Sequence, residues 1–198
     1  MSAQSAEPGR RRRADAQRNY DLLVAAARDV FHDHGVDAPL DDIARRAGVG
    51  NATMYRHFPT RRELIIAVYA DEVAALCDRS RSLLTVDPPG DALFGWLRDF
   101  VAHVATKREL ALSITDDRTG QRSALFDHWH DSMHTAASAL LTRAQSAGAV
   151  RPDLSATELL ALANGIALTA TDAARTERLL LLVRQGTDTP ALSADGIR

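Results

Sequence analysis

Apolar residues recur with the period of an α-helix in every long patterned segment of the chain. The first such segment predicts a helix over about 15–34, and Gly35 ends the pattern. Its apolar positions are Leu22, Leu23, Ala26, Ala27, Val30 and Phe31.

Two short helical patterns follow around a glycine turn. Pro39 suits the opening of a helix, two aspartates follow at its positive end, and the pattern ends by Gly48. The next pattern starts at Asn51, a residue suited to N-capping, and ends at Phe58 before a proline. The segment of about 39–58 therefore matches a helix-turn-helix, whose second helix enters the major groove of DNA.

The rest of the chain predicts six more helices, and Thr60 is suited to cap the first of them. Their ranges are about 60–84, 93–104, 107–115, 123–147, 156–171 and 174–185. Proline- and glycine-containing breaks such as "TVDPPGDAL" and "GAVRPDLS" separate them. We therefore predict an all-α fold of about nine helices.

The helix over 51–58 divides its residues between two faces. Met54 and Phe58 lie four apart and can face a core. The outward set contains donors and acceptors for base edges and phosphates, together with one methyl group that can touch thymine. This set is Asn51, Ala52, Thr53, Arg56 and His57, and Tyr55 can also donate to a phosphate. The alternative is an ordinary solvated helical hairpin.

The segment "DDIARRAGVGNATMYRHFPTRREL", with "AAARDVFHDHGVDAPL" before it, resembles the DNA-binding domain of TetR-family transcriptional regulators. The resemblance implies that Tyr55 and Arg61 bind phosphates. It also implies that Asn51, Ala52 and Arg56 face bases. One departure is Pro39 with Leu40, where family members often carry serine or threonine, so only backbone N–H groups can bind a phosphate there.

Charge is distributed unevenly although the formal net charge is only -2. Residues 1–65 contain 11 arginines and 9 acidic residues, whereas residues 66–198 contain 13 basic and 17 acidic residues. Residues 10–13 are all arginine, in a predicted disordered arm over 1–14. Such arms contact phosphates or a minor groove, so Arg12 and Arg13 join the predicted DNA contacts. The alternative is a merely solvated tail.

The middle helices carry aromatic residues with a few polar groups among them, as small-molecule pockets do. The predicted pocket residues are Trp96, Phe100, His103, Phe126, Trp129, His130, Met133 and Asn164. An aromatic stripe of this kind also fits an ordinary core. His130 and His134, with Asp127 one turn before His130, could hold a metal, but no ligand beyond these is identifiable, so no metal or cofactor is predicted.

The "LLLLV" segment over 179–183 is apolar on every side of a helix. A partner subunit would cover its second face, whereas a central helix in a monomeric core is the alternative. The family resemblance implies a homodimer through helices of about 156–171 and 174–185. A two-fold dimer would present paired recognition helices to a roughly palindromic operator, with half-sites about 34 Å, or a multiple of that distance, apart.

Composition limits the remaining classes. The one cysteine, Cys77, excludes an intramolecular disulfide, and no long apolar run predicts a membrane span, so we expect a cytoplasmic location. No nucleophile motif or phosphate loop indicates an enzyme. We predict a DNA-binding domain over 15–62, a ligand-binding and dimerisation domain over 63–186 and a flexible tail over 187–198.

The predicted function is a homodimeric repressor that a small-molecule effector releases from its operator. The alternatives are a constitutive DNA-binding regulator with no effector pocket and a helical enzyme.

Overall fold

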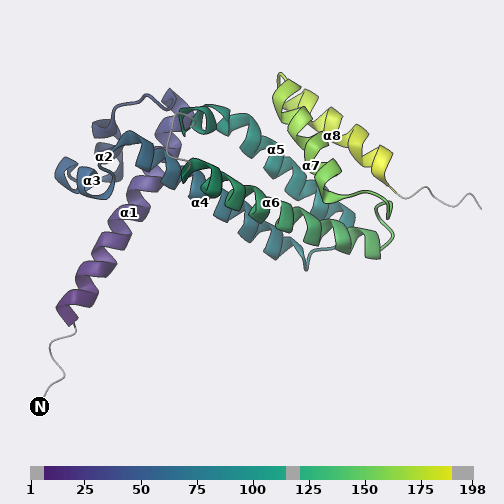
Figure 1. The fold of residues 1–198 in the computed structure, drawn as a ribbon, viewed down its shortest axis with the longest axis horizontal. Coiled ribbons are helices and arrows are strands. Elements are labelled where there is room, and N and C mark those ends of the chain that lie inside the picture. The colour runs from purple at the N-terminus through teal and green to yellow at the C-terminus, as the bar shows by residue number, and fades with distance from the viewer. Residues whose placement is uncertain (1–6, 115–120, 189–198) are drawn as a thin grey trace, which may run out of the picture. The chain divides into compact units, whose positions relative to one another are not determined.

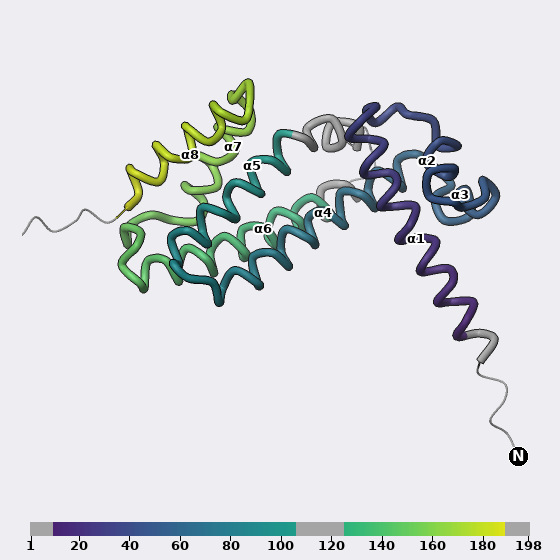
Figure 2. Tube along the Cα trace, turned by 180° about the vertical axis from the view of Figure 1, so that it is seen from behind, coloured from purple at the N-terminus to yellow at the C-terminus, as the bar shows by residue number. Residues whose placement is uncertain are grey.

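The computed structural model describes residues 7–114 and 121–188, with side chains over 10–105 and 125–188 (Figures 1 and 2). The described backbone forms the helices α1 Glu7–His34, α2 Leu40–Ala47, α3 Asn51–His57, α4 Arg61–Leu83, α5 Pro89–Ile114, α6 Gln121–Ser146, α7 Ala156–Thr169 and α8 Ala173–Thr187. None of the described helices is both long and apolar enough to cross a membrane. The predicted all-α fold is confirmed.

The eight helices of residues 7–114 and 121–188 are one fewer than predicted, because α5 is continuous. The sequence predicted a helix over about 93–104 and a separate short one over 107–115. Residues 102–114 contain neither glycine nor proline. The polar residues around 107–109 interrupt the apolar stripe, but they are good helix formers and do not end the helix.

The structure corrects the predicted disordered arm over 1–14, because α1 already begins at Glu7. Pro8 lies in the first turn, where a proline costs no hydrogen bond. The arginines that follow are good helix formers. Residues 10–13 are therefore exposed side chains on a helix, and residues 1–6 of the predicted arm lie outside the described part.

The chain divides into two compact units. The first unit holds α1, α2, α3 and α4 up to Asp71, with the end of α5 from Glu109. The second holds the chain from Glu72 to Arg108 and everything from α6 onwards. The boundary within α4 differs from the predicted one, which stood between residues 62 and 63.

The core of the first unit comes from the apolar stripes of its helices. Its fully buried side chains include Leu23, Ala27, Ile43, Ala44, Met54, Leu64 and Val68. Leu22, which the pattern included, is 40% exposed, because the stripe of α1 centres on its neighbour Leu23. A capping box fixes the start of α4. Glu63 N donates to Thr60 Oγ1 at 3.2 Å, and Thr60 N donates to Glu63 Oε2 at 3.0 Å, which confirms the predicted cap.

The core of the second unit is built around Trp96, which has no exposed surface. Its indole Nε1 donates to the carbonyl oxygen of Leu76 at 2.9 Å, so α5 is tied to α4 by a buried hydrogen bond. Other fully buried members are Leu93, Leu97, Val101, Ala137, Leu140 and Leu159.

Polar contacts hold α8 in place. Arg98 on α5 makes two hydrogen bonds to the Glu177 carboxylate, one of 2.8 Å from Nη2, and these bonds raise the pKa of the guanidinium and lower that of Glu177. At the other end of α8, Arg151 N donates to the carbonyl oxygen of Thr187 at 2.9 Å. Residue 187 therefore belongs to the folded unit, although the sequence assigned it to the tail. Residues 189–198 lie outside the described part.

Candidate nucleic-acid interface

The inward face of α3 is apolar, as predicted. Met54 has no exposed surface and Phe58 is 3% exposed. The Phe58 ring lies with its centroid 5.1 Å from that of Tyr20 on α1. Truncation of such buried side chains typically costs about 2–5 kcal/mol, so these residues fix which side of α3 faces outward.

A glycine turn sets α3 against α2. Gly48 has φ of 67°, a left-handed conformation in which a side chain would be strained. Gly48 N donates to Arg45 O at 3.2 Å, and Val49 N donates to Ala44 O at 3.0 Å. This pair of bonds is a Schellman motif, which ends α2 and redirects the chain into α3.

The N-cap of α3 differs from the prediction. Gly50, not Asn51, occupies the cap position, and no side chain accepts a capping hydrogen bond there. The carbonyl oxygen of Gly50 accepts from Thr53 N at 2.8 Å and from Met54 N at 3.0 Å. Asn51 is therefore the first helical residue, and its exposed amide takes no part in capping.

The residues of α3 that were predicted to contact DNA are accessible to different degrees. Asn51, Ala52, Tyr55 and Arg56 are exposed. Thr53 and His57 are half-buried, and the His57 ring lies edge-on to Tyr20 with centroids 6.3 Å apart. Arg12 and Arg13 are exposed on α1.

Tyr55 has a partner that the sequence did not indicate. Its hydroxyl donates to Asp41 Oδ1 at 3.4 Å, and both side chains are exposed. In the sequence, Asp41 is only one of the two aspartates at the start of the helix after Pro39. No local pattern pairs it with a residue on the next helix, since the contact depends on the turn between α2 and α3.

Arg61 lies at the start of α4 and is half-buried. Its Nη1 donates to the carbonyl oxygens of Val36 at 2.7 Å and Ala38 at 2.5 Å. The guanidinium predicted to bind a phosphate is thus already engaged with the chain between α1 and α2.

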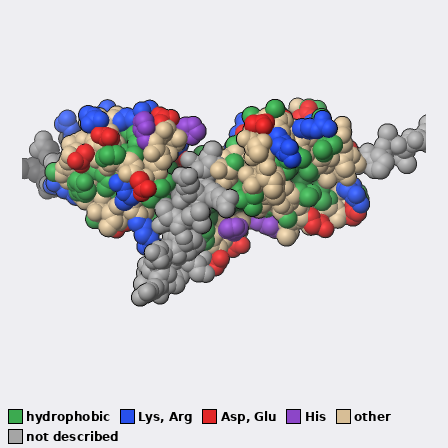
Figure 3. Space-filling view, turned by 90° about the horizontal axis from the view of Figure 1, so that it is seen from above, with side chains coloured by type: hydrophobic (Ala, Val, Ile, Leu, Met, Phe, Trp, Pro, Cys, Tyr) green, Lys and Arg blue, Asp and Glu red, His purple; other side chains and the backbone are tan. Residues whose placement is uncertain are grey.

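Ion pairs neutralise several arginines of the first unit. Arg28 pairs with Asp71, Arg46 with Asp29 at 3.1 Å, and Arg45 with Asp42 at 2.8 Å. Figure 3 shows basic and acidic side chains interspersed on the face in view. Arg56, in contrast, forms no ion pair with any described residue. Its full charge is available to an anion or a guanine edge.

The predicted pocket residues on α5 lie in the core of the second unit. Trp96 stacks on Phe100 with ring centroids 5.6 Å apart, and Phe100 is 3% exposed. The side chain of His103 is 7% exposed and its Nδ1 lies 3.8 Å from Oε2 of Glu72, itself 11% exposed. The sequence did not single out Glu72, because nothing local marks a carboxylate on α4 as the neighbour of a histidine on α5.

The predicted residues of α6 divide between inside and outside. Trp129 and Met133 are each 5% exposed, and the Phe126 ring meets Trp129 edge-on at 5.3 Å. His130 is exposed, with Nδ1 3.1 Å from the carbonyl oxygen of Phe126. Asn164 on α7 is half-buried.

The histidines of the metal alternative have protein partners. His134 Nε2 lies 3.2 Å from Thr157 Oγ1, and Ser138 Oγ lies 3.5 Å from its Nδ1. Within the described residues, no three His, Cys, Asp or Glu side chains come close enough to hold a metal ion.

An open cavity of about 940 Å³ lies along α7 and the chain that enters it. Its lining residues are Arg151, Asp153, Leu154, Glu158, Ala161, Leu162, Gly165, Thr169, Gly186 and Thr187. A smaller cavity of about 390 Å³ between α5 and α8 is lined by Phe94, Arg98, Glu177, Arg178, Leu180, Leu181 and Arg184. None of the predicted pocket residues lines either cavity.

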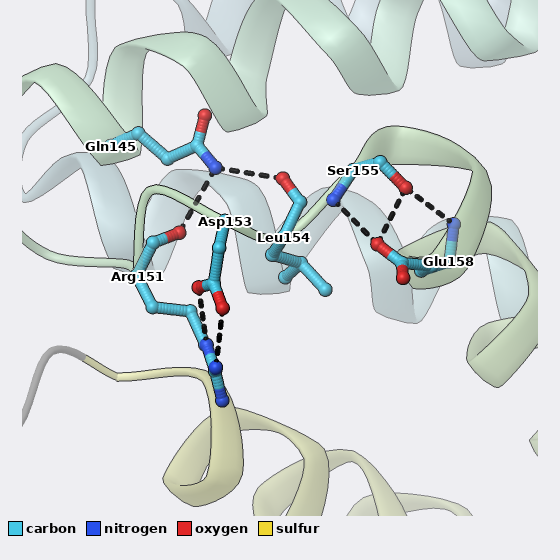
Figure 4. A network of polar contacts seen from close by, with 6 residues as sticks. All are labelled: Gln145, Arg151, Asp153, Leu154, Ser155 and Glu158. Atoms are coloured by element: carbon cyan, nitrogen blue, oxygen red, sulfur yellow. Dashed lines mark hydrogen bonds and ion pairs between the residues drawn. The ribbon is translucent and has the colours of Figure 1, made fainter.

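A polar network borders the larger cavity (Figure 4). Arg151 donates to both carboxylate oxygens of Asp153, at 2.6 and 2.5 Å, and lowers the pKa of that carboxyl. Ser155 and Glu158 form a capping box for α7, and hydrogen bonds from Ser155 lower the pKa of Glu158. Gln145 on α6 donates to the carbonyl oxygen of Arg151 at 3.0 Å. The network fixes the entry to α7.

The chain is similar to known families in both of its halves. Residues 23–68 match the family described as bacterial regulatory proteins, tetR family. Residues 88–188 match the family described as transcriptional regulator SbtR-like, C-terminal domain.

Curated relatives match mainly over part of their length. The chain is 41% identical over 69 residues to the HTH-type transcriptional activator FasR of Mycolicibacterium smegmatis, which is 34% of this chain and 31% of that protein. It is 28% identical over 109 residues to the HTH-type transcriptional regulator CymR of Pseudomonas putida, and these residues make up 54% of this chain and 54% of that protein. The chain thus spans about a third to a half of the length of these curated relatives.

Solved structures match over almost their whole length. A TetR transcriptional regulator from Streptomyces coelicolor is 39% identical with a TM-score of 0.72, over 87% of this chain and 99% of that one. A TetR transcription regulatory protein from Mycobacterium vanbaalenii is 34% identical with a TM-score of 0.72, over 89% of this chain and 98% of that one. These relatives are regulators, in agreement with the prediction that the chain is not an enzyme. The chain therefore belongs to the TetR family of DNA-binding transcriptional regulators.

Proposed function

We propose that the protein is a homodimeric regulator that reads an operator through the exposed face of α3. The observation that carries the proposal is the division of this helix. Met54 is fully buried, whereas Asn51, Ala52 and Arg56 are exposed. Arginine pairs with guanine and asparagine with adenine in the major groove, and an alanine methyl can touch the thymine methyl group.

Phosphate contacts would fix the orientation of α3 without reading sequence. Donors on or beside that helix are Thr53, Tyr55 and His57. Arg12 and Arg13 would add contacts from the exposed start of α1. A protein that neutralises several phosphates loses affinity steeply as salt rises, so the proposed contacts have a measurable signature.

Selection from a random-sequence duplex pool tests operator binding. We expect the purified protein to enrich a two-fold symmetric motif with half-sites about one helical turn, or a multiple of it, apart. Enrichment of no motif at modest ionic strength would contradict the proposal.

The proposed dimer forms through α7 and α8. Apolar side chains on these helices remain exposed in the single chain, namely Leu162 at 47%, Leu168 at 57%, Leu181 at 53% and Leu182 at 52%. Leu180 of the "LLLLV" segment is buried within the chain, so the packing of the chain itself covers only one apolar face of that segment. Large apolar side chains left exposed on two helices favour an interaction site, and a two-fold axis would pair them with their copies in a second chain. Sedimentation of the wild-type protein tests the dimer, and a monomer at micromolar concentration would contradict it.

The proposed signal is a small molecule bound among the middle helices of the second unit. The sequence pattern of aromatic residues with polar neighbours supports it, namely Trp96, Phe100, Phe126 and Trp129 with His103. Trp96, Phe100 and Trp129 are buried and none of the five lines either cavity, so the ligand would have to open space among them. Coupling of about 1–3 kcal/mol would weaken operator binding about 5- to 150-fold. Because both tryptophans of the chain lie in this set, a panel of apolar ligands can be screened by tryptophan fluorescence.

Repression is the proposed direction of control, although the relative FasR is described as an activator. A promoter–reporter assay with the selected operator tests the direction, and higher expression with the regulator present would contradict repression. If none of the screened ligands changes the affinity for the operator, the result favours a constitutive regulator with no effector pocket.

A further inference from the structure

Arg61 connects the start of α4 to the chain segment that leads into α2. One guanidinium nitrogen, Nη1, donates to two backbone carbonyl oxygens, those of Val36 and Ala38. Ala38 is buried at 6% exposure, and Arg61 itself is half-buried. Charge-assisted hydrogen bonds are stronger than neutral ones, and here they form without DNA.

A glycine turn shapes the segment that Arg61 holds. Gly35 ends α1 with φ of 80°, and Ala38 N donates back to Gly35 O at 3.3 Å. The N-cap of α2 is Pro39, and no side chain caps this helix. Arg61 therefore supplies a side-chain donor to two carbonyl oxygens of the segment that enters α2, and unpaired backbone groups of this kind are costly when they are buried.

We propose that Arg61 is a positioning residue that sets α2 and α3 against α4, and that it does not bind a DNA phosphate. The connection runs from Arg61 to residues 36–38, then to α2, and through the Gly48 turn to α3. This inference rests on the proposed operator binding through α3. A molecule in which α2 is displaced does not bind the operator. The apparent affinity of the protein for DNA therefore falls in proportion to the fraction of molecules in which α2 is in place.

The test compares Arg61→Met, which keeps the apolar stem but removes the donors, with Thr60→Ala, which removes only the cap of α4. The probe is a labelled duplex selected by the wild-type protein from a random pool. For Arg61→Met we expect affinity lower by at least roughly 10-fold, because loss of the two charge-assisted bonds lowers the fraction of molecules in the binding-competent arrangement. We also expect an unchanged slope of log affinity against log salt. In the free variant, amides over residues 36–43 should exchange faster by hydrogen exchange, whereas in Thr60→Ala they should exchange as in wild type.

Two results would overturn the positioning role. If the slope of log affinity against log salt were smaller by about one in Arg61→Met than in wild type, Arg61 would be identified as a phosphate contact. Unchanged exchange over residues 36–43, or equal changes there in both variants, would show that Arg61 does not hold this segment specifically. If the wild-type protein retained no duplex, the proposed operator binding would fail instead, while the exchange measurement would still decide whether Arg61 holds residues 36–38.

Discussion

The hydroxyl of Tyr55 on α3 donates to the carboxylate of Asp41 on α2 across 3.4 Å, on the exposed side of both helices. The bond is long, and the carboxylate would repel a phosphate placed beside the hydroxyl. If Tyr55 binds a phosphate as proposed, Asp41 competes with DNA for its hydroxyl donor.

Opposite effects are expected from the two members of this pair. Tyr55→Phe should lower duplex affinity by about 1 kcal/mol, since one donor to a phosphate is lost. Asp41→Asn should raise affinity modestly, because it removes a negative charge near the DNA. Fluorescence anisotropy with a selected duplex measures both. Weaker binding by Asp41→Asn would mean that the carboxylate is needed to orient Tyr55.

Arg56→Ala should relax base preference at one position of each half-site. The expected cost is about 1–3 kcal/mol on the preferred sequence and much less on other sequences. Arg45→Ala is the matched control, since Arg45 is also exposed but pairs with Asp42. Selection repeated with each variant measures the change. Equal losses on all sequences would reassign Arg56 to the phosphate backbone.

The four arginines over 10–13 should not be equivalent. With about 3.6 residues per turn, Arg12 and Arg13 lie on the side of α1 that carries Leu23 and Tyr20, whereas Arg10 and Arg11 lie on the other side. Replacement of Arg12 and Arg13 by alanine should reduce the salt slope by about two. The same change at Arg10 and Arg11 should reduce it less. If the slope of log affinity against log salt falls equally in the two double variants, the four arginines act together as nonspecific positive charge.

Charge placed on the exposed leucines of α8 should separate the proposed dimer. Leu181→Glu with Leu182→Glu would bury unpaired carboxylates at the interface, which should raise the dimer dissociation constant by at least about 100-fold. Leu22→Glu, at a leucine of 40% exposure on α1, is the control and should leave association unchanged. Sedimentation velocity measures the distribution of both variants. A dimer that persists in the double variant would place the interface elsewhere.

Trp96→Phe should destabilise the second unit. The substitution leaves the buried Leu76 carbonyl without its 2.9 Å donor and opens space in a fully buried site, for an expected loss of about 2–4 kcal/mol. Chemical denaturation measures the loss. A change below about 0.5 kcal/mol, the range of surface substitutions, would mean that the Trp96 site is not tightly packed.

The features of the first unit that sequence could predict are local. The 3.6-residue period placed Met54 inward, Gly48 marked the turn, and Thr60 marked a cap, and each depends on residues a few positions apart. The Arg61 and Asp41 contacts join residues 23 and 14 positions apart, so no periodic pattern encodes them. The start of α1 was missed because a run of four arginines is typical of disordered arms as well as of exposed helices.

The most direct test of base reading by α3 replaces single guanines of a selected operator with 7-deazaguanine, which lacks the N7 acceptor in the major groove. Wild-type protein and the Arg56→Ala variant are titrated against each modified duplex. We expect one position in each half-site at which the modification weakens wild-type binding but leaves the variant unaffected. If at every position the modification instead weakens binding of both proteins equally, or leaves binding of both unchanged, Arg56 does not read a guanine. Either result would contradict the central claim.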